Sequence, residues 1–427
     1  MIHVVQAGES LDRIARTYGI SVARLRSDNG LTADQVLVPG QALVVVEPTA
    51  VYTVQPGEGL YQVAGATGVS VPRLLQLNQT VSRTAALRPG EVLTTAAEGT
   101  LRGPLTVGGY AYPHIRPAVL ARAMPFLTDL SIFAYGFRED GSLVAPDDAA
   151  LLAEAARYGA GAVLVLTSID ESGTFSTARA ARLFQDAALQ DRVLGALIDV
   201  MEEKGYRGLD ADFEYIAAEG AAAYLAFLGH ARDRLHARGL FLHVDLAPKT
   251  YAGQPGLLYV AHDYAAIGAI ADSVLVMTYE WGYAYGPPMA VAPLPQMEAV
   301  LRYAVTEIPP WKILMGVPNY GYDWILPYEQ GRRATTLGNE EAVRLAARVG
   351  AEIRFDEGAR APTFSYRADG QDHIVWFEDA RSIRAKLDLA LELGLAGIAY
   401  WNLLRPFAQN WAYLSTTIAV RPTDEAH

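Results

Sequence analysis

Short apolar runs alternate with longer amphipathic stretches from about residue 105 to near the C-terminus. The runs are rich in Val, Leu, Ile and aromatic residues, whereas stretches such as residues 181–205 space their apolar residues three or four positions apart, as helices do. Strands that alternate with helices are typical of parallel βαβ units. Eight strands are predicted, at residues 105–112, 130–137, 162–168, 208–215, 240–248, 273–281, 313–321 and 397–402.

Eight such units over roughly 315 residues predict an α/β protein with a (β/α)₈ TIM barrel, whose functional side chains lie at the C-terminal ends of the strands. We expect this barrel to occupy residues 103–420. The alternation is interrupted at about 322–376 by three strand-like pieces and a helical stretch at 339–350. We interpret this segment as a small α+β insertion between strands seven and eight.

The first hundred residues follow a different pattern, which repeats after about 49 residues. HVVQAGESLDRIA in the first copy corresponds to YTVQPGEGLYQVA in the second, and each copy closes with a Pro-Gly turn and an apolar strand. Each is predicted to form a small βααβ domain. The copies occupy residues 1–47 and 51–97, with residues 47–50 and 96–104 interpreted as connecting segments.

The composition of the chain restricts the classes of binding partner and cofactor that we expect. The net charge of −12 and the absence of a sustained Lys/Arg cluster argue against nucleic acid and an anionic membrane surface. No apolar run reaches the roughly 18 residues of a membrane span, and MIHVVQAGES does not have the pattern of an export signal. The chain has no cysteine, no HExxH and no phosphate-binding loop, so neither a metal nor a cofactor is expected.

The stretch RGLDADFEYI carries the candidate chemistry. Asp210, Asp212 and Glu214 fall at every second position of predicted strand four, so they share one face near the mouth of the barrel. Like charges so close raise one another's pKa. Glycosidases commonly flank the scissile bond with two carboxyl groups, but neighbours on one strand point the same way. The spacing therefore favours one acid with supporting neighbours and a nucleophile from elsewhere.

The N-terminal copies resemble LysM modules, whose YxVxxGDTLxxIA pattern is met nearly throughout both copies, with Glu9 and Glu58 at the usual Asp position. The resemblance implies binding of β-1,4-linked N-acetylglucosamine polymers, peptidoglycan or chitin. The expected groove lies between the loop after the first strand and the loop after the second helix. These loops are residues 7–11 and 27–31 in the first copy, and 56–60 and 77–81 in the second.

The remainder resembles the chitinase-like barrels of family 18 glycoside hydrolases, whose DGxDxDxE motif appears here as RGLDADFE, with Arg207 at the first Asp position. The resemblance implies that Glu214 is the general acid/base, that Asp212 orients the acetamido group of the substrate, and that Asp210 buffers Asp212.

Two further motifs support the same resemblance. The sequence MTYE implies that Tyr279 holds the acetamido carbonyl, beside Met277, and that Glu280 binds sugar or tunes a pKa. Trp401, at the end of predicted strand eight, corresponds to the aromatic floor beneath the cleaved sugar. Additional rim candidates are Tyr110, Tyr135, Asn319, Tyr320 and Trp324.

LysM modules ahead of a family 18 barrel resemble the spore cortex-lytic N-acetylglucosaminidases of endospore-forming bacteria. This resemblance implies a retaining, substrate-assisted hydrolase of peptidoglycan that is made in the cytoplasm and deposited on the spore, in keeping with the missing export signal. Two alternatives remain open, a chitinase or chitooligosaccharide hydrolase and a non-catalytic glycan-binding spore protein. The oligomeric state and the choice between chain ends and internal bonds are open as well.

Overall fold

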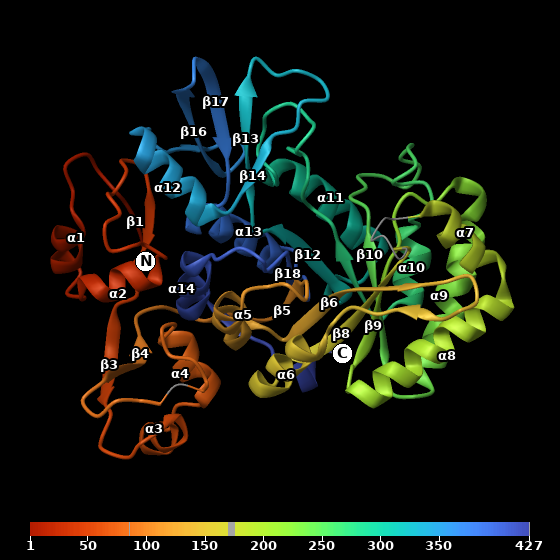
Figure 1. The fold of residues 1–427 in the computed structure, drawn as a ribbon, viewed down its shortest axis with the longest axis horizontal. Coiled ribbons are helices and arrows are strands. Elements are labelled where there is room, and N and C mark those ends of the chain that lie inside the picture. Colours follow the sequence, from red (N-terminus) through yellow and green to blue (C-terminus); the bar gives the residue numbers. More distant parts are fainter. Residues whose placement is uncertain (85, 170–175, 427) are drawn as a thin grey trace.

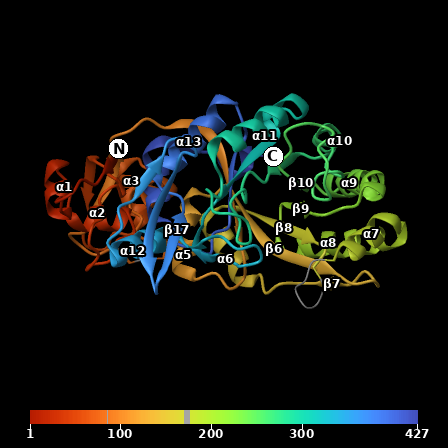
Figure 2. The same ribbon diagram turned by 90° about the horizontal axis from the view of Figure 1, so that it is seen from above.

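The computed structural model describes residues 1–84, 86–169 and 176–426, in which two small N-terminal modules lie against one flank of a larger barrel (Figure 1). The insertion rises from the barrel on the side next to the first module, and the same arrangement is visible from above (Figure 2). None of the helices in this part of the chain combines the length and the apolar character that crossing a bilayer requires.

The described residues form a closed barrel of eight parallel strands, which confirms the predicted fold class. In chain order, each barrel strand pairs in parallel with the next, beginning with β5 and β6. The last strand, β18, pairs in parallel with β5 and so closes the ring. The barrel strands are β5 (Arg102–Ala111), β6 (Asp129–Phe137), β8 (Gly161–Thr167), β9 (Gly208–Asp212), β10 (Phe241–Leu246), β11 (Ser273–Val276), β12 (Ile313–Pro318) and β18 (Gly397–Trp401).

Helices cover the outside of the barrel and bury an apolar stripe against it, as the amphipathic stretches predict. The helices are α5 (Pro117–Ala123), α6 (Ala149–Tyr158), α7 (Thr177–Gln185), α8 (Ala187–Lys204), α9 (Ala221–His236), α10 (Tyr264–Ile270), α11 (Leu294–Glu307), α13 (Ala380–Glu392) and α14 (Ala408–Thr417). Two short strands, β7 (Leu143–Val144) and β19 (Ile418–Val420), extend the sheet beyond the ring.

Strands β9 and β11 end earlier than the apolar pattern predicts. The pattern runs to residues 215 and 281, whereas pairing stops at Asp212 and Val276. The backbone then turns, and two non-glycine residues, Tyr215 (φ 55°) and Glu280 (φ 66°), adopt the left-handed conformation. Such a conformation costs roughly 1–3 kcal/mol and persists where the surroundings enforce it. Both residues directly follow a candidate catalytic side chain.

The insertion is a five-stranded antiparallel sheet in the order β14-β13-β17-β16-β15, with one helix packed on it. Its strands are β13 (Gly321–Leu326), β14 (Thr335–Leu337), β15 (Arg354–Asp356), β16 (Ala361–Ala368) and β17 (Gln371–Trp376), and its helix is α12 (Asn339–Val349). Three of its side chains, Tyr322, Thr336 and Glu341, line a hollow that Glu280 and Trp401 of the barrel also line.

Both N-terminal modules have the predicted βααβ order. The first contains β1 (Ile2–Val4), α1 (Leu11–Thr17), α2 (Val22–Asp28) and β2 (Ala42–Val44), and the second contains β3 (Pro48–Thr53), α3 (Leu60–Thr67), α4 (Val71–Leu77) and β4 (Val92–Ala97).

A repeated asparagine explains part of the internal repeat. The Asn29 side chain accepts a hydrogen bond from the N–H of Val44 and donates to the carbonyls of Leu25 and Val44. Asn78 makes the equivalent bonds to Leu74 and Thr94. The asparagine in each predicted groove is therefore buried and ties the second helix to the returning strand.

The modules are docked on the barrel, and residues 47–50 do not form the expected free connection. Strand β3 already begins at Pro48, which pairs with Ala97. Arg122 of α5 donates to the carbonyl of Ser27 in the first module and to the Gln79 side chain in the second. The last turn of α2 and the loop after α4, which belong to the predicted grooves, therefore contact the barrel.

Gln409 of α14 joins the first module to the barrel through a buried side chain. Its amide donates to Asn29 and to the Ala42 carbonyl, and its oxygen accepts the N–H of Ala380. Gln409→Ala is expected to lower the free energy of unfolding by about 2–4 kcal/mol, because it leaves buried polar groups without partners. Denaturant unfolding measures the loss, with the exposed Gln371→Ala as control. Equal stability of the two variants would show that the docking contributes little.

Candidate active site

The acidic segment runs from the end of β9 into the following loop. Asp210 and Asp212 point to the same side of the strand and are 0% and 5% exposed. Glu214 lies two residues beyond the end of the strand and is half-buried. Arg207 lies just before the strand, where its guanidinium donates to the Thr423 carbonyl. The sequence difference at residue 207 is thus at the opposite end of β9 from the acid.

A cleft of about 410 Å³ opens above the C-terminal ends of the barrel strands. Residues from the loops after β9, β10 and β11 and from the end of β18 form its walls. The predicted residues among them are Asp212, Glu214, Met277, Tyr279, Glu280 and Trp401. The cleft is also lined by residues that were not predicted, namely Asp245, Tyr215, Tyr259, Trp281 and Tyr283.

The carboxyl groups of this cleft hold protons more tightly than ordinary carboxyls do. Burial, reinforced by the charge of Glu280, raises the pKa of Glu214. Burial, followed by the charges of Glu214 and Asp210, raises the pKa of Asp212 well above its usual value. Burial also raises the pKa of Asp210 to about 7. A raised pKa favours the protonated form of a carboxyl, the form that a general acid requires.

Tyr279 and Glu280 come from the turn after β11. Tyr279 is 9% exposed, and burial raises the pKa of its hydroxyl well above the usual value, so that the hydroxyl stays a hydrogen-bond donor. Glu280 accepts hydrogen bonds from the hydroxyls of Tyr320 and Tyr322, which lie at the start of the insertion. Tyr320 therefore acts on the cleft through Glu280.

Trp401 forms part of two adjoining hollows. It lines the main cleft and a second hollow that also contains Tyr320, Tyr322 and Arg405. Its ring is held edge-on by Tyr110 at 5.5 Å and by Phe133 at 5.2 Å between ring centroids. A fixed aromatic face between two hollows can support a sugar at the point where a glycan chain crosses the barrel mouth.

Tyr110 lies beneath the cleft rather than at its rim. It is 1% exposed, and its hydroxyl lies 2.8 Å from a carboxylate oxygen of Asp210 and 2.8 Å from one of Asp245. It thus contacts the acidic cluster and the Trp401 ring from inside the barrel. A direct contact with substrate, expected from its position near a strand end, does not fit this location.

Three other rim candidates point away from the cleft. Tyr135 donates to Asp148 at 2.5 Å on the outer face of the barrel. Asn319 is buried and donates to the carbonyls of Asn402 and Arg405, so it fixes the loop after Trp401. Trp324 is 2% exposed and donates to the Gly286 carbonyl. Their positions near the ends of predicted strands placed them at the barrel mouth, but their side chains face the protein.

His262 positions the acid segment, although it was not among the residues predicted for the site. The N–H of Ala247 donates to His262 Nδ1 at 2.8 Å, so the ring proton is on Nε2, which donates to the Phe213 carbonyl at 3.1 Å. Burial lowers the pKa of His262 to about 4, which keeps the ring neutral. His262 thus links the segments that follow the adjacent strands β9 and β10. No pattern around this lone histidine indicates such a contact.

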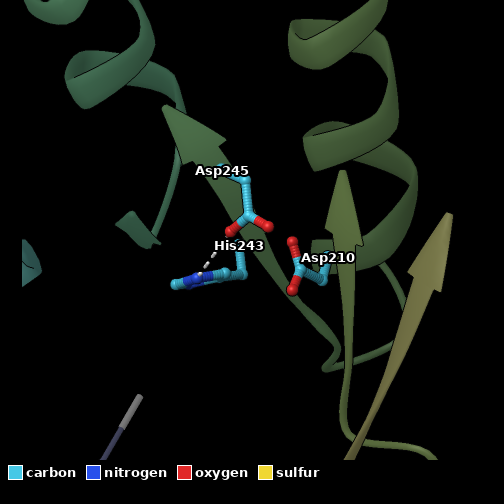
Figure 3. Close-up of side chains that lie close together, drawn as sticks. All are labelled: Asp210, His243 and Asp245. Atoms are coloured by element: carbon cyan, nitrogen blue, oxygen red, sulfur yellow. Dashed lines mark ion pairs between the residues drawn. The ribbon is translucent and has the colours of Figure 1, made fainter. Parts of the chain in front are cut away.

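Asp245 was also missed, although His243 and Asp245 alternate on predicted strand five in the same way as the carboxylates of strand four. Asp210, His243 and Asp245 point toward one another (Figure 3). In the part of the chain that the structure describes, they are the only group of metal-type donors within 4.8 Å of one another. Two of their oxygens face Tyr110 and His243 Nδ1 lies 2.7 Å from Ser273 Oγ, so hydrogen bonds already engage the cluster.

Comparison with known proteins agrees with this geometry. The "Cortical fragment-lytic enzyme" of Bacillus anthracis is 39% identical over 422 residues, 97% of each chain. The crystal structure of the Bacillus cereus spore cortex-lytic enzyme SleL superposes with a TM-score of 0.83 at 36% identity and covers 99% of both chains. A chitinase from Chromobacterium violaceum superposes at 0.67 with 28% identity, over 73% of this chain and 98% of its own.

The family models divide the chain as the fold does. Residues 3–46 and 52–95 match the LysM domain, so both N-terminal modules are LysM domains. Residues 132–405 match the glycosyl hydrolases family 18 model, a stretch that contains the acid segment, the turn after β11 and Trp401. With the closed barrel and the cleft at its mouth, the chain belongs to glycosyl hydrolases family 18 and is a glycosidase.

Proposed function

We propose that this chain is a retaining N-acetylglucosaminidase that cleaves β-1,4 bonds in spore cortex peptidoglycan, with cortex fragments as its preferred substrate. The observation that carries the proposal is the 39% identity to a protein named cortical fragment-lytic enzyme over 97% of both chains, modules and barrel together. The likeness to the spore cortex-lytic enzyme SleL supports the same substrate, and with it an association with the spore.

In the proposed reaction, Glu214 gives its proton to the glycosidic oxygen, and the acetamido oxygen of the same sugar attacks the anomeric carbon. Family 18 enzymes use such substrate assistance in place of a second carboxylate. Asp212 accepts the acetamido N–H, the Tyr279 hydroxyl donates to the acetamido carbonyl, and Trp401 supports the sugar ring. Water then opens the cyclic intermediate, with Glu214 as the base.

The LysM domains are proposed to hold the enzyme on cortex glycan. Their first loops, at residues 7–8 and 56–57, are exposed, whereas the last turn of α2 and the loop after α4 contact Arg122. Glycan contacts are therefore proposed at the exposed loops. Docked modules would also keep the bound glycan at a fixed position relative to the cleft, which raises the local substrate concentration.

The proposal is tested by incubating the full chain separately with cortex fragments and with chitin oligomers, and by identifying the products by mass after borohydride reduction. Cortex fragments are expected to react faster and to acquire N-acetylglucosamine at the new reducing ends. Muramic acid at those ends would contradict the proposed bond. Faster cleavage of chitin oligomers would favour the second candidate, a chitinase, which the 28% identical chitinase structure supports.

A further inference from the structure

The hydroxyl of Tyr110 lies between two carboxyl groups. Its oxygen is 2.8 Å from Asp210 Oδ2 and 2.8 Å from Asp245 Oδ1. A tyrosine hydroxyl has one proton, so it can donate to only one of these oxygens. The other contact is a hydrogen bond only if that carboxyl is protonated and donates to the tyrosine oxygen. The geometry therefore requires a proton on Asp210 or Asp245.

The same carboxyl groups are enclosed by protein. Asp210, Asp212 and Asp245 are 0%, 5% and 3% exposed, and the buried Oδ1 atoms of Asp210 and Asp212 have no hydrogen-bond partner among the described residues. A buried, unpartnered carboxylate oxygen is costly, and a proton shared between neighbouring carboxyls removes that cost. Asp245 also lines the cleft, so the cluster extends from the site of reaction into the barrel.

His243 lies on the far side of Asp245, with Nε2 3.6 Å from Asp245 Oδ1 (Figure 3). The register of β10 against β9 pairs His243 with Asp210, which brings the two strands' polar side chains together inside the barrel. The titratable groups that face Asp245 are Asp210, Asp212 and Glu214 from β9 and its loop, Tyr110 from β5, His243 from β10, Tyr224 from α9 and Tyr279 from the turn after β11.

We propose that Asp245 is a positioning residue of the reaction, which shares a proton with Asp210 through Tyr110 and thereby determines whether Asp210 can receive the proton of Asp212. The inference rests on the catalytic roles proposed above for Asp212 and Glu214. It adds a fourth carboxyl, from the neighbouring strand, to the three that the acidic motif supplies.

The transfer is balanced, and it requires the Asp212 carboxyl to turn toward Asp210, because the Oδ1 atoms of the two residues have no hydrogen-bond partner among the described residues. The O–H bond of Asp212 breaks and its proton goes to Asp210 Oδ1, while the proton on Asp210 Oδ2 passes to the Tyr110 oxygen and the Tyr110 proton passes to Asp245 Oδ1. No atom enters or leaves. Asp212 becomes negative when the acetamido group becomes positive, and Asp245 becomes neutral. The charge is thus available in the transition state and absent before it, which is the condition for catalysis.

Asp245→Asn is the test, because asparagine keeps the shape and the contact with Tyr110 but cannot take up the proton. The variant is expected to lose about tenfold in kcat, equivalent to about 1.4 kcal/mol, with KM little changed. The acidic limb of kcat/KM is expected to move to lower pH by about one unit. The sign follows because in the variant Asp210 itself must accept the proton of Asp212, and removal of the negative neighbour lowers the pKa of Asp210, so protonation of this acceptor blocks the transfer only at lower pH.

Tyr110→Phe should reproduce the loss of kcat, and the double variant should be no slower than the worse single variant, since both break one path. Asp148→Asn is the matched control, because Asp148 is a buried carboxyl that also accepts from two tyrosines but lies outside the cleft. A merely structural role of Asp245 would lower stability and kcat without moving the acidic limb, and that result would overturn the proposal.

An independent readout separates this inference from the proposed function. Infrared difference spectra of the inactive Glu214→Gln protein should show the carbonyl band of a buried protonated carboxyl near neutral pH, and Asp245→Asn in that background should shift or remove it. An unchanged band would contradict proton sharing even if Glu214 proves to be the acid. A band that is absent throughout, with activity that depends on added Zn²⁺ and is lost with a chelator, would replace the proton by a metal.

Discussion

Glu214→Gln is expected to reduce kcat on cortex fragments by at least about 10²-fold, with KM and the unfolding midpoint nearly unchanged. Glutamine preserves the shape of the side chain but cannot protonate the leaving oxygen. Burial and the nearby charge of Glu280 raise the pKa of Glu214, which favours the protonated form that donates to the leaving oxygen. Steady-state kinetics with a soluble fragment and denaturant unfolding measure the two quantities.

Glu219→Gln is the matched control, because Glu219 lies five positions further along the same segment and is exposed. It should retain full activity. If Glu214→Gln keeps more than about a tenth of the wild-type rate, another group donates the proton. The inactive full-length variant should still sediment with insoluble cortex, and soluble N-acetylglucosamine oligomers should compete, since binding by the LysM domains does not require Glu214.

The barrel could be predicted because its strands are buried on both faces. Continuous apolar runs of this kind stand out against the helical stretches, and all eight runs became barrel strands. The ends of the strands could not be predicted in the same way. The runs continue past Asp212 and Val276, but the chain leaves the sheet there, and Tyr215 and Glu280 then adopt the left-handed conformation. Sequence pattern does not encode that conformation for residues other than glycine and asparagine.

Side-chain direction at the strand ends also escaped prediction. Tyr135 lies near the end of its strand, but its hydroxyl donates to Asp148 outside the cleft. Tyr110, in contrast, turns inward beneath Trp401. His262 and Asp245 belong to the site through contacts between strands and loops far apart in the chain. Such partners are determined by tertiary packing, about which one sequence without relatives gives little information.

Docking of the LysM domains on the barrel is a further feature that could not be predicted from the sequence. The segments at 47–50 and 96–104 resemble linkers because they are short and polar or small, yet both contribute to strands. The contacts that fix the modules come from single side chains, such as Arg122 and Gln409, on helices of the barrel. An exposed arginine and a buried one look alike in the sequence, so the rigid arrangement becomes evident only in the structure.

The second large effect is expected at Asp212, the carboxyl proposed to hold the acetamido group. Asp212 is buried and lines the cleft together with Tyr279, which approaches from the neighbouring side of the barrel mouth. If the acetamido oxygen is the nucleophile, these two side chains must hold it against the anomeric carbon. An intramolecular nucleophile held in this way reacts far faster than one from solution, with effective molarities of up to roughly 10⁵–10⁸ M.

Asp212→Ala is accordingly expected to lower kcat by roughly 10²–10³-fold and to abolish inhibition by a thiazoline analogue of the cyclised intermediate. The exposed Asp199→Ala serves as control and should behave as wild type. De-N-acetylated oligomers should bind wild-type enzyme without being cleaved, because they lack the nucleophile. NMR in the first seconds of reaction should show the β anomer, since two inversions at one carbon retain configuration. An α anomer, or a sugar trapped covalently on a protein carboxylate, would exclude the acetamido group as nucleophile and leave Asp212 with a different task.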